Sequence, residues 1–336
     1  MADSLDARIV YLLFFPHVSP VTGQAQPPTL KKSAPYFLEL DTEFAELGQS
    51  QVSVEGCAVS VRRQVIDGQV QSVECAYTLP DLLNPASNAR KQALHNKLRE
   101  TILREAGYGG SFFEEYMVIC LSVAPPTPEE FTQANRLALA TLLRSQSLSE
   151  TEVDQTLISR AQYSERDLTI VDWEGALIIA AEGDFHSDIE LLKIGNYQLL
   201  RYRLLDRAIE RNLERVRREL TSKRRLNFLS DAVLREALEQ RLEILLSFEK
   251  TEQLLLLIGD WYSAQLYRLI VDEFYINDWK AAVRGKLDQL ESITSAVREN
   301  FAFSWQRFLD IVQIAGWLIL LVGYFVLFFL DVWQQK

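Results

Sequence analysis

The sequence has little cysteine, histidine and methionine, and it has no proline after residue 128. Its 336 residues include 3 Cys, 3 His and 2 Met. Three scattered cysteines are too few for a disulfide framework or a cysteine-based metal cluster. The histidines lack the spacing of a zinc-protease pair, and no Walker A phosphate loop is present. We therefore predict a protein that is not an enzyme and that holds no cofactor and no metal.

Positive charge is also in deficit. Lys and Arg total 35 against 46 Asp and Glu, which gives a formal net charge of -11. This balance argues against a general polyanion binder, so nucleic acid is not the partner we expect. An acidic stretch from Asp167 to Glu190 is interpreted as a solvated rim, with a divalent-cation site as the alternative.

One segment reverses this balance. Between Arg201 and Arg225 there are ten Lys and Arg residues against four Asp and Glu residues. Several opposite charges there are three residues apart, which suits the solvated edge of a helix. The end of the segment has less acidic compensation and is a candidate contact for an acidic protein partner or anionic lipid, with RNA as a further alternative. The candidate residues are Arg215, Arg217, Arg218, Lys223, Arg224 and Arg225.

The proline distribution predicts two architectures within an α+β fold. All ten prolines lie in the first 128 residues, and proline is excluded from helix interiors. We predict a mixed α/β head over residues 1–183 and a long, coiled-coil-like helical stalk over residues 184–300.

The head is predicted from short apolar runs and helix-start signals. Thr127-Pro128-Glu129-Glu130 and the pair Ser149 and Glu152 are typical of helix N-termini. An Asp67-Gly68 hairpin turn places Cys57 opposite Thr78, on the other face of the sheet from Cys75. The predicted strands are Ile9–Phe15, Tyr36–Leu40, Val52–Ile66, Gln69–Leu79, Tyr116–Val123, Leu168–Trp173 and Ala176–Ala181, and the predicted head helices include Asn88–Ala106 and Phe131–Leu143.

The stalk shows helical spacing of apolar residues nearly to the end of the chain. The first stripe, from Ile189 to Leu220, is longer than a typical globular helix and needs partner helices. A second helix is predicted from Ser230 and a third over Trp261–Phe274. A fourth begins at Asn277, and two alternatives remain for it: one continuous helix through residue 330, or a break at the aromatic segment Phe301–Trp305. Copies of the same chain are the simplest partners, so we expect a homo-oligomer.

The end of the chain predicts a membrane helix. Residues 311–330 carry no charge, and a helix of that length crosses a bilayer. Two arginines precede the span, which places the N-terminal domain on the cytoplasmic side, or on the matrix or stromal side of an organelle. The prediction is a single-pass, tail-anchored protein with a short tail over residues 331–336. The anchor residues are Ile311, Trp317, Tyr324, Leu330 and Trp333.

Part of the C-terminal third resembles a known family. Trp261, Tyr267, the run Lys286-Leu287-Asp288-Gln289-Leu290, Ile293 and Val297, followed by an apolar helix, look like the end of the family called required for meiotic nuclear division. That resemblance implies an α/β head with a C-terminal anchor, in an inner mitochondrial membrane protein linked to translation, and it implies no catalytic residues. The plan of head and stalk is also similar to CorA-type magnesium channels, which have a second membrane helix and a Gly-Met-Asn loop that this chain lacks.

These observations lead to one functional hypothesis and one alternative. The first is a non-enzymatic, tail-anchored scaffold or tether at the cytoplasmic membrane face, with the lipid bilayer, further copies and an unknown protein as partners. The alternative is a CorA-like ion-transport relative or regulator, in which acidic residues of the head sense a cation.

Overall fold

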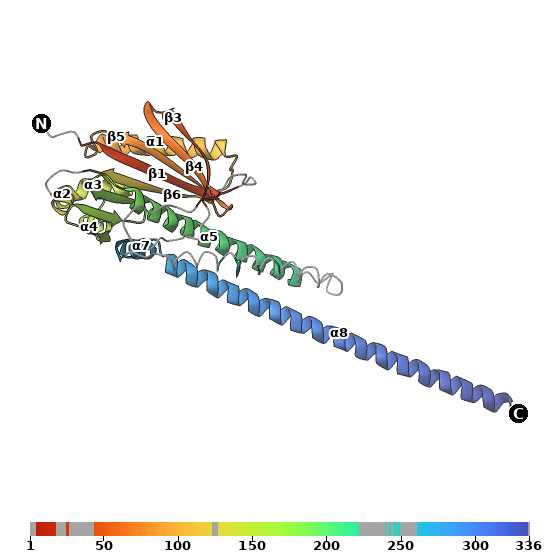
Figure 1. Ribbon diagram of the computed structural model, residues 1–336. Helices are drawn as coiled ribbons and strands as arrows, with labels where there is room; N and C mark the ends of the chain where they lie inside the picture. Colours follow the sequence, from red (N-terminus) through yellow and green to blue (C-terminus); the bar gives the residue numbers. More distant parts are fainter. Residues whose placement is uncertain are drawn as a thin grey trace. The chain divides into compact units, whose positions relative to one another are not determined.

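The computed structural model describes residues 5–17, 25–26, 44–122, 127–221, 239, 242, 245–246, 248 and 261–334 (Figure 1). The chain divides into two compact units. The first unit combines Met1–Asp206 with Ser247–Ala282, and the second combines Arg207–Leu246 with Val283–Lys336. The predicted strand Tyr36–Leu40 and the predicted start of a helix at Ser230 lie outside the described residues.

The first unit is built on one mixed sheet. Its described residues form nine strands in the order β2-β3-β4-β5-β1-β6-β9-β8-β7. Only β6 and β9 are a parallel pair; the other neighbouring strands are antiparallel. The strands are β1 (Ala7–Pro16), β2 (Ala25–Gln26), β3 (Phe44–Val54), β4 (Cys57–Ile66), β5 (Val70–Leu79), β6 (Glu114–Leu121), β7 (Arg160–Ala161), β8 (Asp167–Val171) and β9 (Gly175–Ala180).

The central strand explains why the sheet is covered on both faces. β1 lies between β5 and β6, and its residues from Ile9 to Phe15 are all buried. A strand with apolar side chains on both faces is stable only between two other layers. The apolar run at the beginning of the sequence therefore forms the middle of the fold, and its prediction as a buried strand is confirmed.

Two hairpin turns set the register of β3, β4 and β5. Glu55 and Gly56 both have positive φ, at 50° and 74°, as a two-residue hairpin turn requires. The predicted single strand Val52–Ile66 is therefore wrong, because this turn divides it into the ends of β3 and β4. The next loop contains three residues between paired Ile66 and Val70, one more than a two-residue turn.

The longer loop changes which side chains share a face. Cys75 pairs with Val61 rather than with Ser60. Because side chains alternate along a strand, a shift of one residue moves a side chain to the other face. Cys75 lies in the main apolar cluster and Cys57 packs against it, so the prediction of opposite faces is wrong. All three cysteines are nevertheless free thiols.

Within the described parts of the chain, four helices cover one face of the sheet: α1 (Pro85–Glu105), α2 (Pro128–Ala134), α3 (Arg136–Arg144) and α4 (Glu150–Thr156). Asn84 caps α1, whose first residue is a proline, and Thr127 and Glu130 form a reciprocal capping box on α2. Ser149 caps α4. The predicted helix Phe131–Leu143 is divided at Asn135, where the backbone leaves helical geometry. The predicted starts at Thr127 and Ser149 are confirmed.

The first part of α5 (His186–Thr221) covers the opposite face, where α7 (Trp261–Glu273) contacts β7 and β8. Gly195 on α5 shows how closely the helices pack, because a Cβ at this position would come within 2.3 Å of an Ile270 methyl carbon on α7. The first unit therefore has three layers, with the sheet in the middle.

A lysine is buried between α5 and the sheet. The side chain of Lys193 is fully buried, and its Nζ lies 2.8 Å from Glu190 Oε1 and 3.5 Å from Glu74 Oε2. Nζ also donates to Gln64 Oε1 at 3.0 Å. The two carboxylates and the amide replace the water that the ammonium group loses on burial. This network fixes the rotation of α5 above β4 and β5.

The second unit contains the rest of α5 and most of α8 (Ile276–Gln334). Lys286 Nζ donates to Glu210 Oε1 at 2.7 Å, so the beginning of α8 in this unit lies beside α5. Val283, Leu287 and Leu290 are buried at helical spacing. Of the two alternatives for the fourth helix, the structure has the continuous one, because α8 runs without a break.

The structure contradicts the prediction of a membrane helix. Among the described residues, no helix combines the length and the apolar character that crossing a bilayer requires. The prediction used the charge-free run alone, whereas in the structure residues 311–330 continue a helix whose earlier turns carry Lys280, Arg284 and Asp288. The assignments as a single-pass, tail-anchored membrane protein with a C-terminal transmembrane helix, and the location that followed from them, are therefore wrong.

We expect Lys193→Met to lower the free energy of unfolding by about 3–5 kcal/mol, because the buried Glu190 and the partly buried Glu74 would remain without their cation. Chemical denaturation followed by circular dichroism measures this. Adding Glu190→Gln should recover part of the loss. Lys97→Met is the control, because Lys97 forms an exposed ion pair on α1 and should change the free energy by less than about 1 kcal/mol. Equal effects of Lys193→Met and Lys97→Met would contradict the prediction.

Candidate functional site

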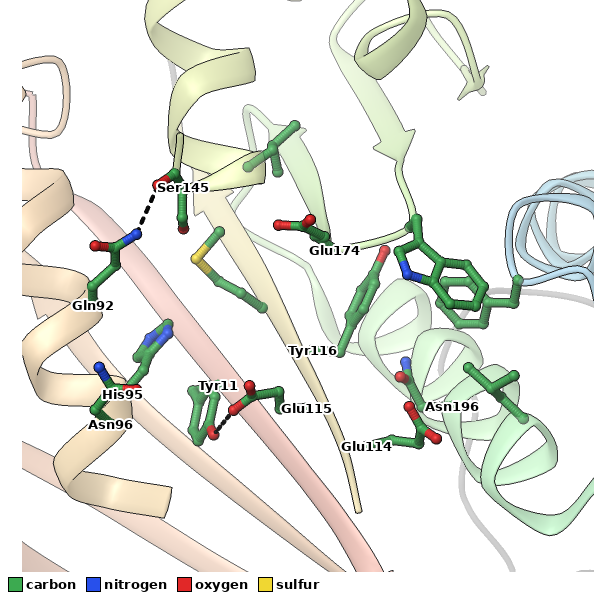
Figure 2. A pocket seen from close by; sticks show the side chains of 15 residues that line it. Tyr11, Gln92, His95, Asn96, Glu114, Glu115, Tyr116, Ser145, Glu174 and Asn196 are labelled. Carbon is green, nitrogen blue, oxygen red and sulfur yellow. Dashed lines mark hydrogen bonds between the residues drawn. The ribbon is translucent and has the colours of Figure 1, made fainter. Parts of the chain in front are cut away.

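A cavity of about 490 Å³ opens where the sheet is incomplete (Figure 2). β6 pairs with β1 from Glu114 onward, but its pairing with β9 begins only at Met117. The first three residues of β6 therefore extend past the turn that joins β8 to β9. Because no described strand lies beside them on the β9 side, side chains from both faces of the sheet reach the same cavity.

Neighbouring carboxylates on β6 line the two sides of this gap. Glu115 points towards α1, where its carboxylate accepts from the Tyr11 hydroxyl at 2.7 Å and from Arg99 Nη1 at 2.8 Å. Glu114 points towards α5 and pairs with Arg203. Burial raises the pKa of Glu114, while the Arg203 charge and hydrogen bond act in the opposite direction. Each carboxylate thus has its own arginine.

Glu174 lines the cavity from the turn between β8 and β9. Burial raises the pKa of its carboxyl group, and the positive charges of Arg144 and Lys91 act in the opposite direction. Neither a hydrogen bond nor an ion pair is made by this carboxylate within the described parts of the chain. Glu174 therefore differs from Glu114 and Glu115 in having no partner of its own there.

An ion pair between Arg144 and Asp172 anchors the turn that carries Glu174. Arg144 at the end of α3 approaches both carboxylate oxygens of Asp172 at 2.8 Å, and Asp172 is 2% exposed. The backbone N–H of Glu174 donates to Asp172 Oδ2 at 3.2 Å, and the Tyr116 hydroxyl donates to the Asp172 carbonyl oxygen at 2.8 Å. These bonds anchor the turn to α3 and β6, so Glu174 is presented on a fixed backbone.

His95 on α1 completes the opposite wall. Its ring stacks on Tyr11 with centroids 4.3 Å apart, and its Nε2 lies 2.8 Å from the Tyr77 hydroxyl oxygen. Burial, assisted by the nearby Lys91 and Arg99 charges, lowers the pKa of His95 to about 3. The imidazole is therefore neutral at pH 7 and adds no positive charge to the cavity.

Aromatic rings form the wall on the α5 and α7 side. Tyr116 meets Phe274 edge to face at 5.2 Å between centroids, and Trp173 meets Phe274 at 6.2 Å. Trp173 is 40% exposed, whereas Tyr116 and Phe274 are buried. Glu174, Tyr116 and Asn196 lie on this side of the cavity, and Tyr11 and His95 lie on the other (Figure 2). The arrangement combines carboxylates, an amide and aromatic faces, which suits recognition of a polar ligand.

The structure places the predicted contact residues elsewhere. Arg215, Arg217 and Arg218 are exposed on the part of α5 that belongs to the second unit, and Arg218 lies 3.5 Å from Glu214. Lys223, Arg224 and Arg225 lie outside the described residues. Of the residues proposed as anchors, Ile311, Trp317 and Tyr324 are exposed on α8, and Leu330 and Trp333 belong to the same helix. None of these described residues lines the cavity.

Sequence reasoning did not identify the cavity. It placed Asp172 and Glu174 in a solvated acidic rim, but Asp172 is buried in an ion pair. No group of three potential ligands among the described residues could hold a metal ion. One available signal was the pair Glu114-Glu115 directly before an apolar strand, because adjacent carboxylates on a strand point to opposite faces.

Residues 23–186 match the family model described as the N-terminal domain of the uncharacterized protein MJ0711. The chain is similar to the uncharacterized protein MJ0711 of Methanocaldococcus jannaschii, at 27% identity over 194 residues. These residues cover 56% of this chain and 59% of the relative, so the chain matches less than two thirds of the relative's length. No solved structure matches. The range of the family model contains Glu114, Glu115 and Glu174.

We expect the neutral state of His95 to make the protein less stable as the pH is lowered. An unfolded histidine takes up a proton near pH 6.5, whereas folded His95 does so only near pH 3. Between these values the unfolded state binds more protons, so the free energy of unfolding should decrease by up to about 1.4 kcal/mol per pH unit as pH falls.

His95→Gln removes this contribution. Denaturant titrations of both proteins at several pH values from 7 to 4 measure it, since the carboxyl groups titrate in both and largely cancel in the difference. Parallel stability curves for the two proteins would show that His95 is not held neutral.

Proposed function

We propose that the protein is a non-enzymatic scaffold that assembles with further copies of itself through α8. The supporting observation is the exposure of large apolar side chains along this helix. Trp317, Ile319 and Leu320 are each about 70% exposed. The other exposed members of this set are Leu309, Ile311, Val312, Ile314, Leu318, Leu321, Val322, Tyr324, Val326 and Leu327. We call these thirteen residues the α8 apolar surface.

An apolar surface of this extent favours association. Contiguous apolar patches on monomeric proteins rarely exceed a few hundred Å², and larger patches are typical of interfaces. Burial of apolar area is worth about 25 cal/mol per Å², so each large side chain covered by a partner contributes about 1–3 kcal/mol. A second copy carries the same surface and is the simplest partner.

The distribution of these residues around the helix indicates an assembly larger than a dimer. The five consecutive residues from Trp317 to Leu321 are all exposed, and five consecutive residues of a helix point in every direction around its axis. One neighbouring helix covers only one side. A bundle of three or more α8 helices covers more of each helix, so we expect at least a trimer that brings several copies of the first unit together.

The assembly is tested by the mass of the full-length chain in a mild non-ionic detergent, which suppresses non-specific aggregation. Multi-angle light scattering should give at least three times the chain mass of 38.5 kDa. Ile314→Glu with Leu318→Glu and Leu321→Glu should reduce the mass to that of one chain, because charged side chains are costly to bury. Circular dichroism checks that the helices remain.

Leu137→Glu is the matched control, because Leu137 is 53% exposed on α3 and does not belong to the α8 apolar surface. It should leave the mass unchanged. A monomeric unmodified protein, or an oligomer that survives the triple substitution, would refute assembly through α8. A mass that changes with added Mg²⁺ would instead favour the ion-responsive alternative.

A further inference from the structure

The described lining of the cavity between β6 and the turn from β8 to β9 contains three carboxylates and no Lys or Arg side chain. Two of these carboxylates have arginine partners: Glu115 pairs with Arg99, and Glu114 pairs with Arg203. Glu174 has no such partner within the described parts of the chain. His95 adds no positive charge because it is neutral at pH 7. The lining therefore favours a cation over an anion.

The surroundings of Glu174 favour an organic cation over a metal ion. The lining residues Trp173, Tyr116 and Phe274 present aromatic rings, which attract ammonium groups through their π faces. A hard metal ion instead requires several oxygen ligands at short distance. No group of three such ligands is found among the described residues. Burial of part of the cavity strengthens both the carboxylate and the aromatic interaction.

The remaining lining limits the ligand's size and shape. About 490 Å³ is within the range of small-molecule sites, which is about 300–1,000 Å³. The cavity extends from Glu174 past Tyr116 to Glu114 and Asn196, and Asn196 is 2% exposed (Figure 2). A flexible chain with amino groups at intervals matches acidic side chains at intervals along the wall better than a compact ion does.

We propose that this cavity binds an aliphatic amine of the size of a di- or triamine, with one ammonium group held between Glu174 and the ring of Trp173. Tyr116 and Phe274 cover the methylene groups next to that ammonium. Glu114 lies at the far end of the cavity, and its carboxylate, which pairs with Arg203, has further lone pairs that accept a hydrogen bond from a second amino group. The proposal adds a ligand to the first unit and does not depend on assembly through α8.

Isothermal titration calorimetry of the full-length protein with spermidine tests the proposal. Glu174→Gln should weaken binding at least about 10-fold, equal to about 1.4 kcal/mol, because the ammonium group loses its carboxylate. Glu182→Gln is the matched control: Glu182 is exposed and does not line the cavity, so its loss should leave the affinity unchanged. Glucose and inorganic phosphate, as neutral and anionic probes, should not bind.

A second readout separates the site from general attraction of a cation to an acidic protein. Spermidine should change tryptophan fluorescence in the unmodified protein, and Trp173→Phe should remove most of that change. Equal affinity of the unmodified and Glu174→Gln proteins, no spermidine binding at all, or equal binding of glucose would overturn the proposal. Binding should persist in the triple α8 variant, so failure of the scaffold proposal would be recognised separately.

Discussion

The candidate site depends on one constraint: β6 pairs with β9 only from Met117 onward, so the first residues of β6 have no β9 neighbour. The turn beyond β8 is held there by the ion pair between Arg144 and Asp172. If the turn extended along β6, it would fill the gap in the sheet. Because Arg144 fixes the turn from the α3 side, Glu114 and Glu115 stay open to a cavity instead of being covered by another strand.

Charge compensation inside the first unit follows one physical rule. A buried charge is costly unless a partner of opposite sign replaces its water. Lys193 meets two carboxylates, Asp172 meets Arg144, and Glu114 meets Arg203. Glu174 differs from these groups, because it is exposed at the cavity and the described residues give its carboxylate neither a hydrogen bond nor an ion pair. Its position on a rigid turn makes it suited to meet a charge from outside the chain.

Local signals predicted many elements of the fold. The apolar run in β1 and the capping residues Thr127 and Ser149 depend on neighbours within a few residues, so the sequence contains the whole interaction. The helical character of the segment from Ile276 was also predictable, because neither proline nor paired glycine occurs in it, but its continuity through Phe301–Trp305 was left open. The turn at Glu55-Gly56 was missed, since the apolar residues on both sides were interpreted as one strand. The membrane helix was wrong because a charge-free run was treated as sufficient evidence.

The sequence by itself determined the α+β composition and the starts of several helices. Only the tertiary structure decided which face each side chain occupies, because one extra residue in the loop after Ile66 reverses the alternation along a strand. The tertiary structure also decided which residues line the candidate site. Tyr11, His95, Glu114, Glu174 and Phe274 come from segments far apart in the chain, and their contacts depend on strand order and on where pairing ends, which no local pattern encodes.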